Sequence, residues 1–351
     1  MLIANLIRAR RTTRASFSRI RQAALVLVAL AAVVPTAHAQ HFPADEELEL
    51  MLRYIVEDSI APGIIVGVLE ADGSTRVVSY GTGGPEAGPM RRHSTFETGS
   101  VSKLFAGTLL ADMVRRGEVA LDDPVAEYLP DAVSVPSLAD REITLVDLAT
   151  HQSGLPRDHR FHSWRDPFAN LTTELLHEMI SEAELRNVPG ARYQYSNIGF
   201  SLLADALARA AGDSYAALVQ RRILDPLDMS MSSFVLEGEI AHAMTQGHEA
   251  DGTQPLYTRP EPVYGPGGLR SNVPDLLKFL AAQVGPPEDE LELSMRMAHE
   301  PQARWEDGRM GLAWHIIEVL GPPIIWHGGT SGGFTTQVAF DPERRIGIVV
   351  V

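Results

Sequence analysis

Ser100 and Lys103 stand three residues apart in the stretch Phe96-Glu-Thr-Gly-Ser-Val-Ser-Lys103. Apolar residues recur with helical spacing after them, Gly99 permits a sharp turn just before the serine, and Gly117 is a natural stop. If Ser100 opens this helix, Lys103 lies one turn further along the same face. A hydroxyl beside an ammonium group at a helix N-terminus is a plausible activated nucleophile, because both positive ends favour developing negative charge. A serine and a lysine at this spacing also occur together by chance in most proteins.

Tyr195 and Asn197 stand two residues apart, just before a predicted helix. A phenol has a pKa of about 10, and a nearby ammonium group favours its phenolate form, which can take a proton from a serine. Asn197 offers both a donor and an acceptor, which suits it to gripping an amide. Taken alone, the pair is better explained as a buried tyrosine and a helix-capping asparagine.

The stretch Trp326-His327-Gly328-Gly329-Thr330 ends a predicted strand. A cation or hydrogen-bond donor followed by glycines would line the wall of a cleft and leave backbone N–H groups available. The alternative is a glycine turn between two strands.

The elements that would position these residues follow a strand, helix, strand order. From about 116 to 285 the pattern is mostly helical, with its clearest helix at 197–211, and a further helix is predicted at 45–58. Strands are predicted towards both ends, at 63–69, 74–80, 311–319, 323–327, 334–340 and 346–351. The economical architecture is an α/β (α+β) fold, in which one antiparallel sheet is built from both chain ends and a helical domain is inserted.

Residues 1–39 differ from the rest of the chain. Six arginines and no acidic residue precede or flank an apolar run at 22–34, and small residues at Ala37 and Ala39 follow. This pattern predicts a signal peptide cut after Ala39, and hence a periplasmic or secreted protein. The rival is a membrane anchor, but the run is short for a span of about 20 residues. We expect no stable membrane anchor after cleavage.

Charge and cysteine content exclude several kinds of function. Removal of the six arginines takes the net charge from −15 to about −21, which disfavours nucleic acid and anionic membrane surfaces as partners. The chain has no cysteine, which rules out thiol catalysis and thiolate metal sites.

Taken together, the three motifs in this order resemble the serine β-lactamase and penicillin-recognising family. The likeness is strongest to its class C branch, which includes AmpH-type D,D-carboxypeptidases/endopeptidases and esterases. The run 143–156 is similar in particular to the AmpH-type group. Other stretches that look like this family are Leu121-Asp-Asp-Pro-Val125, Pro189-Gly190, Leu224-Asp-Pro-Leu-Asp-Met229, Gly267-Gly-Leu269 and Gly333-Phe334.

The resemblance implies a β-lactamase/transpeptidase-like fold over 40–351 and a role for each site residue. Ser100 is the nucleophile, and Lys103 and Tyr195 share the acid and base work, with the first base left open. Asn197 holds the substrate amide. The backbone N–H groups of Ser100 and Thr330 form the oxyanion hole beside Gly328 and Gly329. The family also carries a helix after the strand at 346–351, so the sequence is expected to lack a C-terminal helix or to be a fragment.

The implied substrates are β-lactams and D-alanyl cell-wall peptides, with no cofactor and no metal. Alternatives are a small-ester esterase, or a penicillin- or peptidoglycan-binding protein with little turnover. His327 stands where many β-lactamases carry a lysine. Because a histidine has a pKa of about 6.5, affinity for carboxylate substrates is expected to rise as pH falls.

Four further features are weaker candidates. Ser331 fits a Gly-x-Ser-x-Gly elbow, but a strand follows it where the elbow needs a helix. His159 and His162 suggest a metal site without a third ligand and are expected to lie in an exposed loop. The loop 157–164, rich in arginine, histidine and aromatic residues, is either a plain solvated loop or a border of the cleft that sorts substrates. His151 is predicted to form structural hydrogen bonds.

Overall fold

A computed structural model describes residues 41–351 except 59, 84–87, 160–167, 250–258 and 319–320. The predicted signal peptide and His162 therefore lie outside the described residues. No helix in the described ranges is long and apolar enough to cross a membrane.

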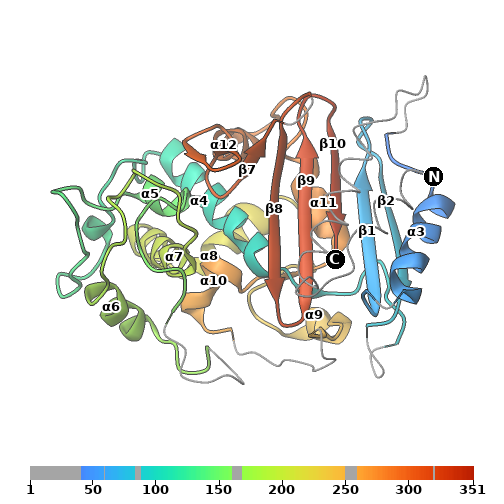
Figure 1. Ribbon diagram of the computed structural model, residues 1–351, viewed down its shortest axis with the longest axis horizontal. Helices are drawn as coiled ribbons and strands as arrows, with labels where there is room; N and C mark the ends of the chain where they lie inside the picture. The colour runs from blue at the N-terminus through green and yellow to red at the C-terminus, as the bar shows by residue number, and fades with distance from the viewer. Residues whose placement is uncertain (1–40, 59, 84–87, 160–167, 250–258, 319–320) are drawn as a thin grey trace.

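One antiparallel sheet of eight strands is built from both chain ends (Figure 1). Its strands are β1 (Gly63–Leu69), β2 (Thr75–Gly81), β5 (Ala303–Trp305), β6 (Gly308–Met310), β7 (His315–Ile317), β8 (Ile324–Ser331), β9 (Phe334–Asp341) and β10 (Ile346–Val350). Their order is β2-β1-β10-β9-β8-β7-β6-β5, so the first hairpin joins the sheet by pairing β1 with β10. The predicted sheet from both chain ends is confirmed.

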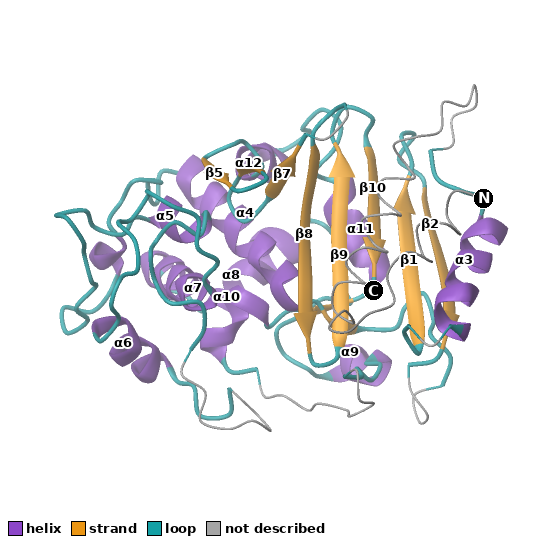
Figure 2. Ribbon diagram, in the orientation of Figure 1, coloured by secondary structure: helices purple, strands orange, loops and turns teal. Residues whose placement is uncertain are grey.

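The helices lie mostly at one side of this sheet (Figure 2). They are α3 (Asp45–Glu57), α4 (Ser102–Arg115), α5 (Leu145–Ala149), α6 (Thr173–Ser181), α7 (Asn197–Ala211), α8 (Tyr215–Val219), α9 (Gly238–Ala243), α10 (Tyr264–Gly267), α11 (Val273–Ala281) and α12 (Glu290–Ala298). Short turns of helix are η1 (Gly99–Val101), η2 (Val125–Tyr128), η3 (Gln220–Leu224) and η4 (Glu261–Val263), and β3 (Phe96–Glu97) pairs with β4 (Arg270–Ser271).

Strand β1 is buried on both faces, which explains its nearly continuous apolar sequence. Helix α11 packs so closely on one face that a Cβ atom on Gly67 would lie 2.4 Å from Val273 Cγ1. On the other face, Val66 and Val68 join a second apolar cluster that includes Leu52 of α3.

Helix α4 runs through the centre of the helical region. Every residue from Ser102 to Met113 is buried, so the helix is covered by protein on all sides rather than along one stripe. It contacts α7, α10 and α12. Gly107 allows the segment before β7 to pack directly against the helix backbone, because a Cβ atom on Gly107 would lie 2.3 Å from Leu312 O.

The predicted strand at 311–319 is wrong in its first half. Of the residues described in this range, His315–Ile317 alone form a strand, because the preceding residues bond to helix ends instead of the sheet. Leu312 N donates to Ala298 O at 2.7 Å, and Ala313 N donates to Ala149 O at 2.8 Å. Ala313 has a positive φ of 69°, which breaks the extended path.

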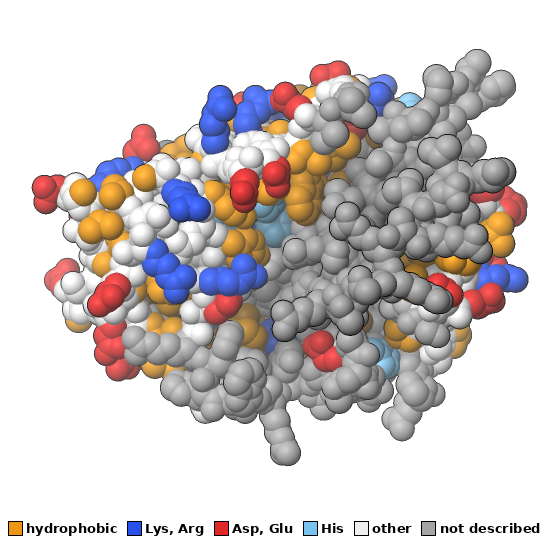
Figure 3. Space-filling model, viewed as in Figure 1, with side chains coloured by type: hydrophobic (Ala, Val, Ile, Leu, Met, Phe, Trp, Pro, Cys, Tyr) orange, Lys and Arg blue, Asp and Glu red, His pale blue; other side chains and the backbone are white. Residues whose placement is uncertain are grey.

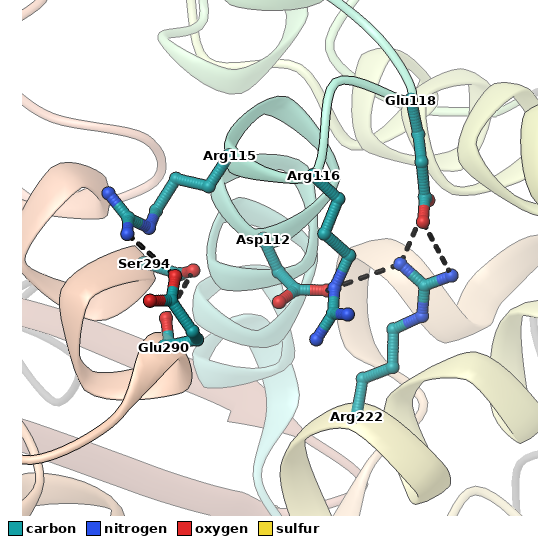
Figure 4. Close-up of polar contacts among 7 residues, drawn as sticks. All are labelled: Asp112, Arg115, Arg116, Glu118, Arg222, Glu290 and Ser294. Atoms are coloured by element: carbon teal, nitrogen blue, oxygen red, sulfur yellow. Dashed lines mark hydrogen bonds and ion pairs between the residues drawn. The ribbon is translucent and has the colours of Figure 1, made fainter.

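Asp112 anchors the C-terminal end of α4 (Figure 4). Its buried carboxylate accepts from Arg116 Nε at 2.8 Å and from Arg222 Nη1 at 3.2 Å. Arg222 also donates to both oxygens of Glu118, at 2.9 and 3.1 Å. The network ties α4 to η3.

We expect Asp112→Ala to lower the free energy of unfolding by about 3 kcal/mol, because it removes the buried partner of two arginines. Denaturant unfolding extrapolated to water measures this loss. Glu290→Ala is the matched control. The Glu290 side chain is 75% exposed in its ion pair with Arg115, and such a pair contributes at most about 1 kcal/mol. Equal losses in the two variants would contradict the buried-pair argument.

Candidate active site

Ser100 lies in η1, the single turn that leads directly into α4. Gly99 opens this turn with a φ of 53°, in the left-handed region that favours glycine. Ser102 Oγ donates to Gly99 O at 2.7 Å and accepts from Leu269 N at 3.1 Å. These bonds fix the turn that presents Ser100.

The backbone of η1 lies directly against β8. A Cβ atom on Gly329 would lie 2.1 Å from Thr98 O and 2.8 Å from Ser100 N. A Cβ atom on Gly99 would in turn lie 2.7 Å from Thr330 N. The approach therefore requires glycine on both sides, and it brings the backbones of Ser100 and Thr330 into one small region.

Lys103 is fully buried one turn after Ser100. Its Nζ lies 3.0 Å from Ser100 Oγ and donates to Asn197 Oδ1 at 2.8 Å and to Pro266 O at 2.7 Å. Burial, and then the positive charge of Arg157, lower the pKa of Lys103 well below its ordinary value, while Asp158 acts in the opposite direction. The site therefore favours the neutral amine.

Tyr195 approaches the same serine from the loop before α7. Its Oη donates to Ser100 Oγ at 2.7 Å. Lys103 Nζ lies 4.9 Å from the centre of its ring, and Arg157 Cζ lies 4.8 Å from it. The structure thus brings Ser100, Lys103 and Tyr195 together around one oxygen.

Asn197, the first residue of α7, links the lysine to a carboxylate that the sequence did not single out. Its Oδ1 accepts from Lys103 Nζ, and its Nδ2 donates to Asp158 Oδ1 at 2.5 Å. Asp158 belongs to the loop 157–164, which the sequence left open as a border of the cleft or a solvated loop, and this was the only sequence signal for it. No motif distinguished it from its neighbours.

His327 lies on β8 but its side chain is 1% exposed, a burial that the sequence did not predict. Its Nδ1 lies 2.9 Å from Gly328 O, which only accepts, so this nitrogen carries a hydrogen. The His327 ring packs 5.2 Å from that of His315, centre to centre. On the face of the molecule seen in Figure 3, Lys and Arg side chains lie over the helical region, beside hydrophobic side chains.

His151 forms structural hydrogen bonds, as predicted. Its buried Nδ1 accepts from Ser196 N at 3.1 Å, and its ring lies 4.2 Å from that of Tyr195. Burial lowers the pKa of His151 well below its ordinary value, so the ring is neutral. The residue supports the backbone that carries Tyr195.

Ser331 is engaged elsewhere, in the buried ion pair of Glu97 with Arg259. Its Oγ donates to Glu97 Oε2 at 2.8 Å and accepts from Arg259 Nη2 at 2.7 Å. Strand β9 follows it, where a nucleophile elbow needs a helix.

His159 is buried, so the expectation of an exposed loop histidine is wrong. Its Nε2 lies 2.8 Å from Ser201 Oγ, which donates its hydrogen to Pro262 O. His159 therefore donates to Ser201 and fastens the loop to α7. Burial lowers the pKa of His159 to about 4. No group of three His, Asp or Glu side chains in the described ranges could hold a metal.

Comparison with known proteins gives consistent matches along most of the chain. A family model described as Beta-lactamase matches residues 51–351. The chain is 29% identical over 348 residues to the D-alanyl-D-alanine-carboxypeptidase/endopeptidase AmpH of Escherichia coli (strain K12), covering 92% of this chain and 89% of that protein.

Solved structures match equally broadly. The beta-lactamase/D-alanine carboxypeptidase from Yersinia pestis, complexed with citrate, has a TM-score of 0.77 and 26% identity, covering 87% of this chain and 91% of that one. A class C beta lactamase from Rhodobacter sphaeroides has a TM-score of 0.74 and 23% identity over 86% and 92% of the two chains. These likenesses confirm the fold class predicted from the sequence.

Proposed function

Since this chain belongs to the beta-lactamase family, we propose that it is an exported serine hydrolase that forms an acyl-enzyme on Ser100. The proposal depends above all on the convergence of two proton-transfer groups on one oxygen. Lys103 Nζ lies 3.0 Å and Tyr195 Oη lies 2.7 Å from Ser100 Oγ. Such a hydroxyl can lose its proton as it attacks a carbonyl carbon.

Counting hydrogens favours Lys103 as the first base. A neutral amine has two N–H donors and one lone pair, and Asn197 Oδ1 and Pro266 O accept from Lys103. If they take both hydrogens, the lone pair faces Ser100 Oγ. Ser100 has a single hydrogen, which then goes to Lys103, while Tyr195 donates to Ser100.

In the acylation step, each proton and each bond can be followed from donor to acceptor. The Ser100 proton passes to Lys103 as the bond from Ser100 Oγ to the carbonyl carbon forms. The carbonyl oxygen becomes an oxyanion, and the family resemblance implies that the backbone N–H groups of Ser100 and Thr330, which the close approach of η1 and β8 brings together, stabilise it. The bond to the leaving nitrogen or oxygen breaks as that atom takes a proton from Tyr195, which Lys103 can reprotonate. Water later releases the acyl group.

The proposed substrates are D-alanyl cell-wall peptides and β-lactams. This assignment is supported by the carboxypeptidase/endopeptidase and beta-lactamase names of the relatives. The proposed compartment is the periplasm or the exterior, on the strength of residues 1–39. Mass spectrometry of the exported protein would test this, and a chain that begins after Ala39 is the expected result.

Small neutral esters are a second candidate class, favoured by the burial of His327. A buried imidazole whose Nδ1 faces Gly328 O is not a permanent cation for a substrate carboxylate. Substrates without a carboxylate need no cation at this position, so the absence of a permanent charge on His327 would weaken their binding less.

Three substrates tested in parallel distinguish these possibilities: a chromogenic cephalosporin, a D-Ala-D-Ala peptide and a short acyl ester. We expect a covalent adduct and turnover with the wild-type protein and neither with Ser100→Ala. Ser331→Ala, which removes the rival nucleophile, is expected to keep the adduct. A stable penicillin adduct with negligible release would instead favour a binding protein. Turnover that survives Ser100→Ala would refute the proposed nucleophile.

A further inference from the structure

A chain of three hydrogen bonds connects Asp158 to the nucleophile. Asp158 Oδ1 lies 2.5 Å from Asn197 Nδ2, Asn197 Oδ1 lies 2.8 Å from Lys103 Nζ, and Lys103 Nζ lies 3.0 Å from Ser100 Oγ. The Asp158 side chain is 35% exposed, whereas Lys103 is fully buried. A carboxylate at the edge of the site therefore reaches the buried base through a single amide.

The two ends of that amide are not equivalent. A carboxylate only accepts hydrogen bonds, so Asp158 requires the nitrogen end of Asn197 on its side. The oxygen end then faces Lys103, where it accepts one of the amine hydrogens. If the amide were turned over, Nδ2 would donate to the lone pair of Lys103 and compete with the Ser100 proton. The orientation of one asparagine thus decides whether the lysine is available as a base.

The backbone on both sides of Asp158 is fastened to the same helix. Asn197 N donates to Arg157 O at 2.6 Å. On the other side, His159 Nε2 lies 2.8 Å from Ser201 Oγ of α7. Asp158 is therefore held opposite Asn197 by its own neighbours, which also accounts for the buried His159.

We propose that Asp158 is a positioning residue that fixes the orientation of the Asn197 amide and so keeps Lys103 free to accept the Ser100 proton. This inference rests on the proposed function, because it assigns Lys103 the role of base. This positioning role is distinct from the substrate sorting that the sequence left open for the loop 157–164.

The charge of Asp158 adds a second, measurable effect. Asp158 raises the pKa of Lys103, against the lowering by burial and by Arg157. The other titratable groups around Lys103 are Tyr195, His151 and His159. Because the neutral amine is the active form, activity rises with pH as Lys103 loses its proton. Asp158→Asn is therefore expected to move this rise to lower pH, and Arg157→Gln to higher pH.

A double-mutant cycle tests whether Asp158 acts through Asn197. We expect Asp158→Ala to slow acylation of Ser100 on the order of 10- to 100-fold, the effect of misplacing a catalytic group. Asp158→Asn keeps an acceptor for Asn197 Nδ2, so its acylation rate is expected to fall less than that of Asp158→Ala. The double variant Asp158→Ala/Asn197→Ala is expected to be no slower than Asn197→Ala alone. Additive losses, or a wild-type rate in Asp158→Ala, would overturn the proposal.

Lysine NMR gives a readout that does not depend on activity. The sequence contains only two lysines, Lys103 and Lys278, so ¹³Cε-lysine labelling yields two resonances to titrate. Lys278 is an internal reference, because its ion pairs with Asp228 and Asp275 raise its pKa. Asp158→Asn is expected to lower the Lys103 midpoint and leave that of Lys278 unchanged. An unshifted Lys103 midpoint would contradict the charge effect.

The two measurements separate this inference from the proposed function. If the wild-type protein formed no adduct on Ser100, the proposed function would fail, while the NMR titration would still test the influence of Asp158 on Lys103. If the wild-type protein is acylated and Asp158→Ala is acylated equally fast, only the positioning role fails. Thermal melting of each variant shows whether a loss of rate comes from unfolding.

Discussion

Lys103→Met is expected to slow acylation of Ser100 by about 10³-fold or more, within the range that a positioned general base contributes. Methionine has a similar length and suits a buried position, but it cannot accept a proton. Tyr195 would remain 2.7 Å from Ser100 Oγ as a donor. Donating this bond stabilises negative charge on Ser100 Oγ, but a neutral phenol does not accept the serine proton, so Tyr195 does not replace the missing base.

The stability of the same variant has a predictable pH dependence. Burial lowers the pKa of Lys103 in the folded protein, so between that pKa and the unfolded value of about 10.4 the unfolded chain binds more protons. Wild-type stability therefore gains from this residue as pH rises through that window. Lys103→Met lacks the gain, so the wild type should become more stable relative to the variant as pH increases.

Stopped-flow acylation with a chromogenic cephalosporin, together with mass spectrometry of the adduct, measures the loss of rate. Lys278→Met is the matched control, because it removes the chain's other lysine from the surface of α11. The acylation rate of Lys278→Met is expected to stay within about twofold of the wild-type rate, because surface substitutions usually have small effects. A Lys103→Met rate within tenfold of the wild type would show that another group takes the first proton.

Local spacing was enough to predict part of this site. Three residues along a helix place Ser100 and Lys103 on one face, and the hydrogen bond between them follows from that geometry. Asn197 begins a helix at the predicted residue. The partners on β8 are distant in sequence, and their place beside Ser100 came from the family resemblance rather than from periodicity.

Contacts between distant segments were not predictable from the pattern of residues. Ala313 leaves the extended path because its N–H bonds to Ala149 O, more than a hundred residues earlier. The burial of His159 depends on Ser201. Asp158 owes its place beside Asn197 to the bonds that its neighbours Arg157 and His159 form with α7, and to no motif of its own. Periodicity reports which face of an element is buried, and not which loop covers it.

Gly329→Ala is expected to slow acylation by about 10²- to 10³-fold, comparable to removing one donor from an oxyanion hole. The added Cβ atom would lie 2.1 Å from Thr98 O and 2.8 Å from Ser100 N. Both contacts are with backbone atoms, so no side chain can rotate away to relieve them. Either η1 moves from β8 or the strand distorts, and in both cases the N–H groups of Ser100 and Thr330 separate.

Gly347→Ala is the control that separates this effect from a general loss of stability. Gly347 also lies in the sheet, on β10, but a Cβ atom there would first meet Leu280 Cδ1, at 3.3 Å. A flexible leucine end can shift by a few tenths of an ångström, so acylation should stay near the wild-type rate. Both variants are to be compared at a temperature well below their melting transitions. If Gly329→Ala also acylated at the wild-type rate, the close approach of η1 to β8 would be a packing feature only, and the oxyanion donors would have to lie elsewhere.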